Sequence, residues 1–325
     1  MTGKLGIALG AAFVVLAGLP AAAQQYPTRA VTVMVPFAAG GGSDLLARLV
    51  TQKLEERLGK PFIIENRPGA GTTIAAMAAV RAAADGYTLM QATSSTMAIN
   101  VTMYKQLAYQ PLKDLTPVAL LSKSPFFLVV RADSPVKSVA DLIRLAREKP
   151  GTLNYGSGGP GSMHHLSTEL LLNLTGTQMT HVPYKATPPA LNDLLAGHIQ
   201  VIFGDTTSLL PMMQQGTVRA LAVSTAERSE AAPEVPTVAE AGVPGFESAS
   251  WQMLVAPGAT PPGIVALLNR EVHAIFSEKA VRDELARRGV GPRITGPPAE
   301  LQTFVKDEIA RWGEIVRRAG VSGML

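Results

Sequence analysis

The segment with the clearest chemical potential offers backbone amides rather than reactive side chains. An apolar run, Val31 to Phe37, is followed by the glycines Gly40 to Gly42 and then by Ser43 and Asp44 at the start of a helix-like segment. Glycine lets the backbone approach a ligand closely, and the first N–H groups of a helix lack partners within it and carry partial positive charge. Each hydrogen bond to a charged acceptor is worth about 1.5–3 kcal/mol, so several amides can hold a carboxylate without Arg or Lys. The segment therefore predicts an anion site, with a plain tight turn as the alternative.

A second glycine-rich segment, Asn154 to Ser162, follows another strand-like run and leads into a segment with leucines at helical spacing. Its Gly156-x-Gly158-x-x-Gly161 pattern is formally a dinucleotide fingerprint. However, Pro160 interrupts the turn, and no acid stands about 20 residues further on to bind a ribose. If the chain folds into two lobes with one such strand–loop–helix anion site in each, the two sites would hold both ends of a small acid between them. A merely structural loop is the alternative.

Other reactive arrangements are weak in this sequence. It contains no Cys and no Gly-x-Ser-x-Gly pentapeptide, which argues against thiol catalysis, disulfides and a serine hydrolase. The adjacent His164 and His165 point to different faces of a helix and lack a third ligand at metal spacing, so we expect no metal and no cofactor. Asp205 follows a strand-like run and is either a pocket residue or an ordinary strand-end acid. Arg67 is more readily explained by pairing with Glu65, or by a solvated position, than by ligand contact.

Strands covered by helices are the elements that must position these loops. Apolar runs of strand length alternate with segments of helical period, which predicts an α/β protein with mainly parallel strands. One helix is predicted over 45–58, capped by Ser43 or Asp44 and ending at Gly59, and another over Val139–Glu148. The predicted strands are Val31–Phe37, Phe62–Glu65, Tyr87–Ala92, Phe126–Arg131, Thr152–Tyr155, Val201–Gly204 and Arg219–Val223.

The first residues have the composition of a secretory signal. Lys4 precedes an apolar run, Leu5 to Leu19, and small residues follow as far as Ala23. The run is shorter than the ~20 residues that a bilayer span needs, so a retained membrane anchor is the less favoured alternative. Cleavage after Ala23 leaves 302 of the 325 residues, which suggests two lobes, and lowers the formal net charge from +4 to +3. Because the basic residues are not clustered with aromatic ones, nucleic-acid binding is not expected.

Five longer motifs follow one another along the chain: Val35–Asp44 (VPFAAGGGSD), Glu65–Gly71 (ENRPGAG), Asp85–Leu89 (DGYTL), His181–Tyr184 (HVPY) and Val235–Glu247 (VPTVAEAGVPGFE). With these motifs the sequence resembles the Bug family, the periplasmic solute receptors of tripartite tricarboxylate transporters, from Tyr26 to about Gly320. The resemblance implies a type II periplasmic binding protein fold. In that fold two α/β lobes, joined by crossing strands at a hinge, close on a ligand whose carboxylate is held by backbone N–H groups and bridging waters.

The division into lobes and the ligand contacts follow from the same resemblance and from the glycine loops. We expect residues 24–125 plus 249–325 to form lobe I and residues 126–248 to form lobe II, with crossings near Ser122–Phe127 and Ser248–Leu254. The sequence departs from the family pattern at Val101, where a proline is usual, and at Ala186, where a glycine is usual. The expected ligand-binding residues are Phe37, Ala39, Gly40, Gly41, Gly42, Ser43, Ser94, Ser157, Gly158, Gly159, His164 and Asp205.

These observations together predict a receptor and not an enzyme. We expect an exported, monomeric periplasmic protein that captures a small mono-, di- or tricarboxylate, with an aromatic acid also allowed. It would deliver this acid to the membrane components of a tripartite tricarboxylate transporter. The alternative is a hydrolase or isomerase that acts on a small acid in the same cleft. It would need a general base beside a nucleophile, whereas the loops offer mainly Gly, Ala and Ser.

Overall fold

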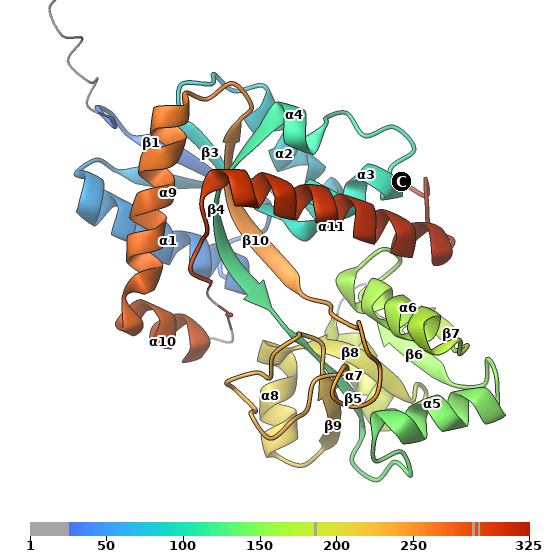
Figure 1. Ribbon diagram of the computed structural model, residues 1–325. Helices are drawn as coiled ribbons and strands as arrows, with labels where there is room; N and C mark the ends of the chain where they lie inside the picture. Colours follow the sequence, from blue (N-terminus) through green and yellow to red (C-terminus); the bar gives the residue numbers. More distant parts are fainter. Residues whose placement is uncertain (1–25, 185–186, 288–289, 292) are drawn as a thin grey trace, which may run out of the picture.

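Two five-stranded sheets, each covered by helices on both faces, form two lobes (Figure 1). The computed structural model describes residues 26–184, 187–287, 290–291 and 293–325. The predicted signal segment and Ala186 lie outside these residues. No helix in these ranges combines the length and the apolar character that a membrane crossing requires.

The first lobe is built on the sheet with strand order β2-β1-β3-β10-β4. Side chains that alternate along its strands are buried on opposite faces, because helices cover both sides. The strands are β1 (Val31–Val35), β2 (Phe62–Asn66), β3 (Thr88–Thr93), β4 (Leu115–Ser124) and β10 (Ser250–Pro257). One face is covered by α1 (Gly42–Leu58), α9 (Pro262–Ser277) and α10 (Lys279–Arg287). The other face is covered by α2 (Thr73–Val80), the π-helix η2 (Ser95–Ile99), α3 (Asn100–Met103), α4 (Pro111–Asp114) and α11 (Pro298–Arg318).

The second lobe is built on the sheet with strand order β7-β6-β8-β5-β9. Its strands are β5 (Phe126–Arg131), β6 (Asn154–Ser157), β7 (Thr180–Pro183), β8 (Val201–Asp205) and β9 (Val218–Val223). Helices α5 (Val139–Glu148) and α6 (Met163–Thr175) cover one face. Helices α7 (Thr187–Ala196) and α8 (Thr206–Gln214) cover the other.

Each sheet contains one strand that runs against its neighbours, and in each case it is a strand by which the chain enters the lobe. β10 is antiparallel to β3 and β4, and β5 is antiparallel to β8 and β9. The prediction that Phe126–Arg131 is a parallel strand is therefore wrong in direction. The reason is that β5 continues from β4 through the crossing between lobes, whereas β6, β7 and β8 are joined by helices and run parallel.

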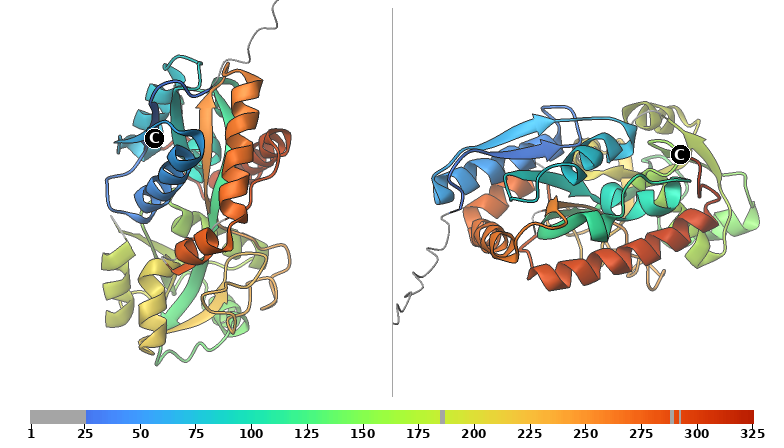
Figure 2. Two further views of the ribbon diagram at one scale, coloured as in Figure 1. Left: turned by 90° about the vertical axis from the view of Figure 1, so that its left-hand side faces the viewer. Right: turned by 90° about the horizontal axis from the view of Figure 1, so that it is seen from above.

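The cores show which side of the molecule joins the lobes. One cluster of buried side chains is continuous through both lobes and includes residues of α11, η2, α5 and α6. Helix α11 packs against α6, and Arg318 of α11 donates to the Asn173 side chain of α6. The other two clusters each belong to a single lobe, one under α1, α9 and α10 and one under α7 and α8. Figure 2 shows α9 running alongside β4 on this second side.

The helix predictions are met except at one terminus. Helix α5 spans the predicted Val139–Glu148, and α1 ends at Leu58 with Gly59 as its C-cap in the left-handed conformation. The prediction that Ser43 or Asp44 caps α1 is wrong. Gly41 occupies the N-cap position without a side-chain hydrogen bond, and α1 begins at Gly42. The glycine backbone makes this turn without a capping side chain.

Candidate ligand-binding site

Sheet topology places both glycine loops at the interface between the lobes. β10 enters the first lobe at Ser250, and β3 runs antiparallel to it, so β3 and its parallel neighbour β1 end at the hinge side. In the second lobe β5 enters at Phe126, and β8 and β6 run opposite to it. The loops after Val35 and Ser157 therefore both lie at sheet ends that face the other lobe.

In the first loop, the buried carboxylate of Asp44 fixes the backbone through hydrogen bonds. Asp44 is only 1% exposed, and its carboxylate accepts hydrogen bonds from the Gly40 backbone N–H (2.9 Å), Arg48 Nε (2.8 Å) and Asn66 Nδ2 (2.9 Å). The same Asn66 amide donates to the Phe37 carbonyl (2.9 Å). Burial raises the pKa of Asp44, but these hydrogen bonds outweigh burial and lower it below its usual range, so the side chain stays ionised.

This arrangement leaves the backbone donors beyond Gly40 available. The N–H groups of Gly41, Gly42 and Ser43 donate to no acceptor within the described residues, and the two glycines are exposed. Gly40 adopts a φ of +89°, which favours glycine. Three neighbouring free amides at the start of a 17-residue helix form the kind of site that binds an oxyanion.

A pair of glutamines that was not predicted from the sequence supports the same loop. Gln91 of β3 is fully buried, and its Nε2 donates to the Ser43 carbonyl (3.1 Å) and to the Gln252 side chain of β10. Ser94, at the end of β3, is 2% exposed. The sequence signal for Gln91 is an amide side chain in the middle of a strand, between Met90 and Ala92.

In the second loop most backbone donors are used internally. The Gly159 N–H donates to Ser157 Oγ (3.0 Å), the Gly161 N–H to His165 Nδ1 (3.1 Å) and the Ser162 N–H to the Gly159 carbonyl (3.1 Å). The Gly158 N–H has no acceptor within the described residues. In this conformation the second loop therefore offers fewer free amides than the first.

Stacked aromatic rings pack next to the second loop and hydrogen-bond to it. His165 and His181 stack with ring centroids 4.1 Å apart, and Tyr155 stacks on His181 at 4.9 Å. Ser157 Oγ lies 2.6 Å from His181 Nε2, which resembles a nucleophile with its base. However, Ser157 is 0% exposed, and its hydroxyl also contacts both the N–H and the carbonyl of Gly159. These contacts make Ser157 a support for the loop rather than a reactive group.

His164 and Asp205 lie close together beside the hinge strand β5. The His164 ring packs edge-on against Phe126 at 4.9 Å, and Phe126 pairs with Asp205 in the register of β5 and β8. Both ring nitrogens of His164 are buried without a hydrogen-bond partner among the described residues. Burial lowers the pKa of His164 more than the charge of Asp205 raises it, so the ring is neutral at pH 7.

Asp205 has a structural role at the same place. It caps α8, because its Oδ1 accepts from the Ser208 backbone N–H (2.9 Å) and from the Thr207 hydroxyl. Burial raises the pKa of Asp205, but these hydrogen bonds outweigh burial and lower it, so Asp205 remains a carboxylate. The residue is both a strand-end acid with a capping role and a charge beside His164.

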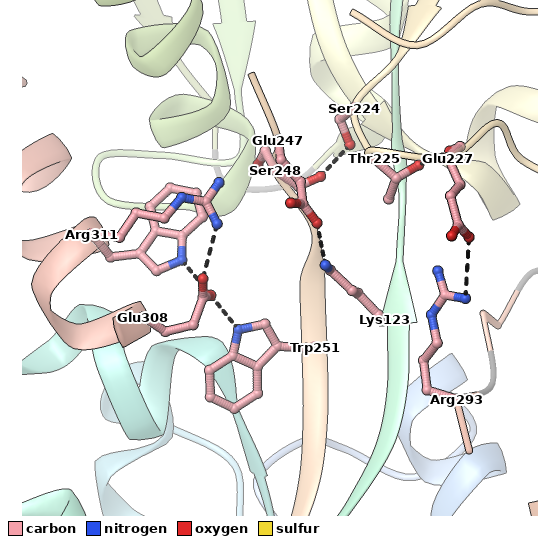
Figure 3. A network of polar contacts seen from close by, with 11 residues as sticks. Lys123, Ser224, Thr225, Glu227, Glu247, Ser248, Trp251, Arg293, Glu308 and Arg311 are labelled. Carbon is pink, nitrogen blue, oxygen red and sulfur yellow. Dashed lines mark hydrogen bonds and ion pairs between the residues drawn. The ribbon is translucent and has the colours of Figure 1, made fainter. Parts of the chain in front are cut away.

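Polar contacts pin the crossing segments together (Figure 3). The Ser224 hydroxyl accepts from the Phe126 N–H (2.9 Å) and donates to the Ser248 carbonyl. Glu308 of α11 accepts from the indole N–H of Trp251 on β10 (2.7 Å) and from that of Trp312 (2.8 Å). These bonds tie β5, β10 and α11 into one hinge.

On the other side of the hinge, charged side chains from both lobes line an open cavity of about 700 Å³. It lies between α10 and the segment 225–231. Lys123 pairs with Glu247, and Arg293 lies 3.9 Å from Glu227 across the two lobes (Figure 3).

Two remaining predictions concern the metal and Arg67. No cluster of three or more potential metal-ligating side chains occurs in the described part of the chain. Arg67 pairs with Glu65, with Nη2 2.7 Å from Oε1, as the sequence favoured.

Comparisons with known proteins agree with one another. The model of the family described as "Tripartite tricarboxylate transporter family receptor" matches residues 46–321. Protein BugT of Bordetella pertussis is 36% identical over 311 residues, which cover 95% of this chain and 95% of that protein. R. palustris Rpa4515, solved with adipate, superposes with a TM-score of 0.78 at 42% identity over 91% of this chain and 99% of the other. MatC from Rhodopseudomonas palustris, with bound malate, superposes with a TM-score of 0.73 at 38% identity over 90% of this chain and 100% of the other.

Proposed function

Because the chain belongs to the tripartite tricarboxylate transporter receptor family, we propose that it is a periplasmic receptor that binds a small carboxylate between its lobes. The similar R. palustris proteins were solved with adipate and with malate, which are both small carboxylates. The observation that carries the proposal is the set of three free amides at Gly41, Gly42 and Ser43, at a sheet end that faces the other lobe.

The free amides supply a large part of the binding energy that such a ligand needs. Three hydrogen bonds to a carboxylate contribute roughly 5–9 kcal/mol before desolvation and ordering are subtracted. Micromolar affinity requires about 8 kcal/mol net. The first loop therefore starts binding but needs help from the opposite lobe. In this proposal the ligand-binding residues are those expected from the sequence, and Ser157, Gly158, Gly159 and His164 reach the ligand when the lobes close.

The same proposal covers the division of the chain, its location and its partners. Residues 24–125 and 249–325 form one moving lobe and 126–248 the other. The chain is exported with residues 1–23 as its signal, and the loaded form docks on the membrane components of the transporter. No reaction on the ligand is proposed. The Ser157–His181 pair, the most nucleophile-like in the described residues, is buried and occupied by the loop backbone.

A panel of mono-, di- and tricarboxylates, including aromatic acids, tests the receptor function. We expect at least one acid to raise the Tm and to bind in isothermal titration calorimetry. Mass spectrometry should then recover that acid unchanged after incubation. Depletion of the acid would favour the enzyme alternative, and silence across the panel would contradict the proposal.

The amide site itself is tested by replacing Gly42 with proline. Gly42 is the first residue of α1, where proline is well tolerated, and Gly41 has the extended conformation that a residue before proline prefers. The change removes one free N–H, so we expect affinity to fall roughly tenfold or more with little change in Tm. Gly42→Ala is the matched control, because it keeps the N–H and its Cβ meets no atom within 4 Å. Equal affinities of the two variants would argue against amide binding.

A further inference from the structure

One polar side chain beside the hinge, His164, has no hydrogen-bond partner within the described residues, and the charged Asp205 lies close to it. His164 is the second residue of α6, directly after the second glycine loop, and neither ring nitrogen has a partner among the described residues. A buried polar group without a partner is unusual in a native protein and calls for a water or ligand. Asp205 keeps its negative charge close to this ring, and Phe126 packs against the ring from the start of β5.

The surroundings limit what can satisfy these groups. A Cβ on Gly158 would lie 3.5 Å from His164 Nδ1, so the loop backbone passes close to the ring on one side. A neutral imidazole has one donor and one acceptor nitrogen, and a carboxylate only accepts. Together His164 and Asp205 offer two acceptors, one donor and one negative charge. An ionised carboxylate placed there would be repelled by the negative charge of Asp205 and could not donate a hydrogen bond to it.

We propose that the ligand group that lies between His164 and Asp205 is a hydrogen-bond donor, a hydroxyl or an ammonium, and not a second ionised carboxylate. This inference rests on the proposed receptor function, with the first carboxylate held at the amides of Gly41 to Ser43. A hydroxyl donates to Asp205 and accepts from the His164 N–H. An ammonium donates to Asp205 and to the unprotonated His164 nitrogen. The receptor therefore selects hydroxy or amino acids over their unsubstituted counterparts.

Matched acids that differ in one group test this selectivity. The probes are butyrate, 3-hydroxybutyrate, 4-hydroxybutyrate and 4-aminobutyrate, together with succinate, malate and aspartate, each titrated by calorimetry. We expect the best donor-bearing member of each set to bind at least about tenfold more tightly than the unsubstituted acid. Comparison of the hydroxyl and ammonium members shows which donor the site prefers. Equal or tighter binding of butyrate and succinate would overturn the inference while leaving the receptor function intact. If no acid binds, the receptor function fails and this inference fails with it.

The variant Asp205→Asn separates the role of charge from that of the helix cap. Asparagine is as good an N-cap as aspartate and can accept from the Ser208 N–H, so the Tm should change little. Loss of the negative charge should reduce the preference for 4-aminobutyrate over butyrate by roughly tenfold and improve succinate binding. The control Asp141→Asn removes the same charge at the start of α5, where Asp141 accepts from the Lys137 N–H and the Ser138 hydroxyl. Unchanged ligand preference in Asp205→Asn, or an equal change in the control, would overturn the inference.

Discussion

Asp44 shows how one buried side chain can prepare backbone groups for binding. It is the third residue of α1, and its carboxylate accepts hydrogen bonds from the Gly40 N–H, which precedes the helix, and from the side chains of Arg48 and Asn66. The donors that remain free in the first loop are those that Asp44 does not reach. An acid within an anion site is therefore not a contradiction, because its charge is already balanced by Arg48 and by hydrogen bonds from the Gly40 N–H and the Asn66 side chain.

The variant Asp44→Asn is predicted to weaken both the fold and the site. An asparagine loses the charge that Arg48 requires and turns one donor toward the donor of Asn66, so we expect the free energy of unfolding to fall by about 1–3 kcal/mol. The pKa of Asp44 is lowered in the folded protein, so its contribution is present above the ordinary aspartate range near pH ~4 and is lost as pH falls through the folded pKa. Urea unfolding of both proteins at pH 7 and pH 3 measures this. Asp307→Asn, at an exposed position of α11, is the control. A difference that is as large at pH 3 as at pH 7 would contradict this explanation.

At the scale of elements, the second loop and α6 depend on neutral histidines. The Gly161 N–H needs an unprotonated Nδ1 on His165, and His165 faces Tyr155, His181 and Glu169. Burial and the nearby His181 lower the pKa of His165 to about 4, and burial also lowers that of His181. Protonation of either ring therefore disturbs the loop that lies above it.

Stability is consequently predicted to fall on acidification between about pH 6.5 and 4. In this window the unfolded chain binds protons at His165 and His181 that the folded chain excludes, so the free energy of unfolding rises with pH by at most ~1.4 kcal/mol per unit for each group. Glu169 acts in the opposite direction, because burial raises its pKa. Chemical denaturation across this range should show a smaller slope for His165→Asn, whereas the exposed His198→Asn should keep the wild-type slope. A wild-type slope in His165→Asn would refute the assignment.

The contact of α11 with the crossing strand β10 yields a second prediction at this scale. Both tryptophans of the sequence donate to the Glu308 carboxylate, which also accepts from Arg311 (2.9 Å). Glu308→Gln places a donor among these donors and should cost about 1.5–3 kcal/mol of unfolding free energy, followed by tryptophan fluorescence in urea. Glu314→Gln is the control on the same helix. It breaks an exposed pair with Arg318 and should cost less than about 1 kcal/mol. An equal loss of unfolding free energy in the two variants would show that the hydrogen bonds of Glu308 stabilise the fold no more than an exposed ion pair does.

The sequence predicted the helices and the first loop better than the contacts between distant segments. Gly40 to Gly42 indicated a helix start with free amides from local pattern alone, and the amides of Gly41 and Gly42 are free. The direction of β5 was missed because a strand that is apolar on both faces has the same pattern in either direction. The internal bonding of the second loop depends on His181, which lies 24 residues from Ser157, and no local pattern reports such a contact.

At the scale of the whole molecule, the asymmetry of the cores defines how the lobes can move. The continuous core and the α11–α6 contact join the lobes along one side, whereas the cores under α1, α9 and α10 and under α7 and α8 are separate. The charged cavity between α10 and the segment 225–231 lies on the separated side. Two ion pairs join the lobes at this cavity within the described residues. Lys123–Glu247 lies at the crossing strands, whereas Arg293–Glu227 is long and exposed, and such exposed pairs contribute little. Closure on a ligand should therefore pivot about the continuous core and narrow this cavity.

Ligand binding is thus predicted to shorten the distance across that cavity. The chain has no cysteine, so two introduced cysteines can carry spin labels without removing any native one. Glu230→Cys on the second lobe and Lys279→Cys on α10 both line the cavity at exposed positions. We expect their label-to-label distance, measured by pulsed electron paramagnetic resonance, to shorten by more than ~2 Å when a saturating carboxylate is added. The pair Glu55→Cys and Lys279→Cys lies within the first lobe and should keep its distance, because α1 packs against α9 and α9 against α10. If calorimetry shows binding while the interlobe distance stays constant, the receptor holds its ligand without closing, and the pivot about the continuous core is wrong.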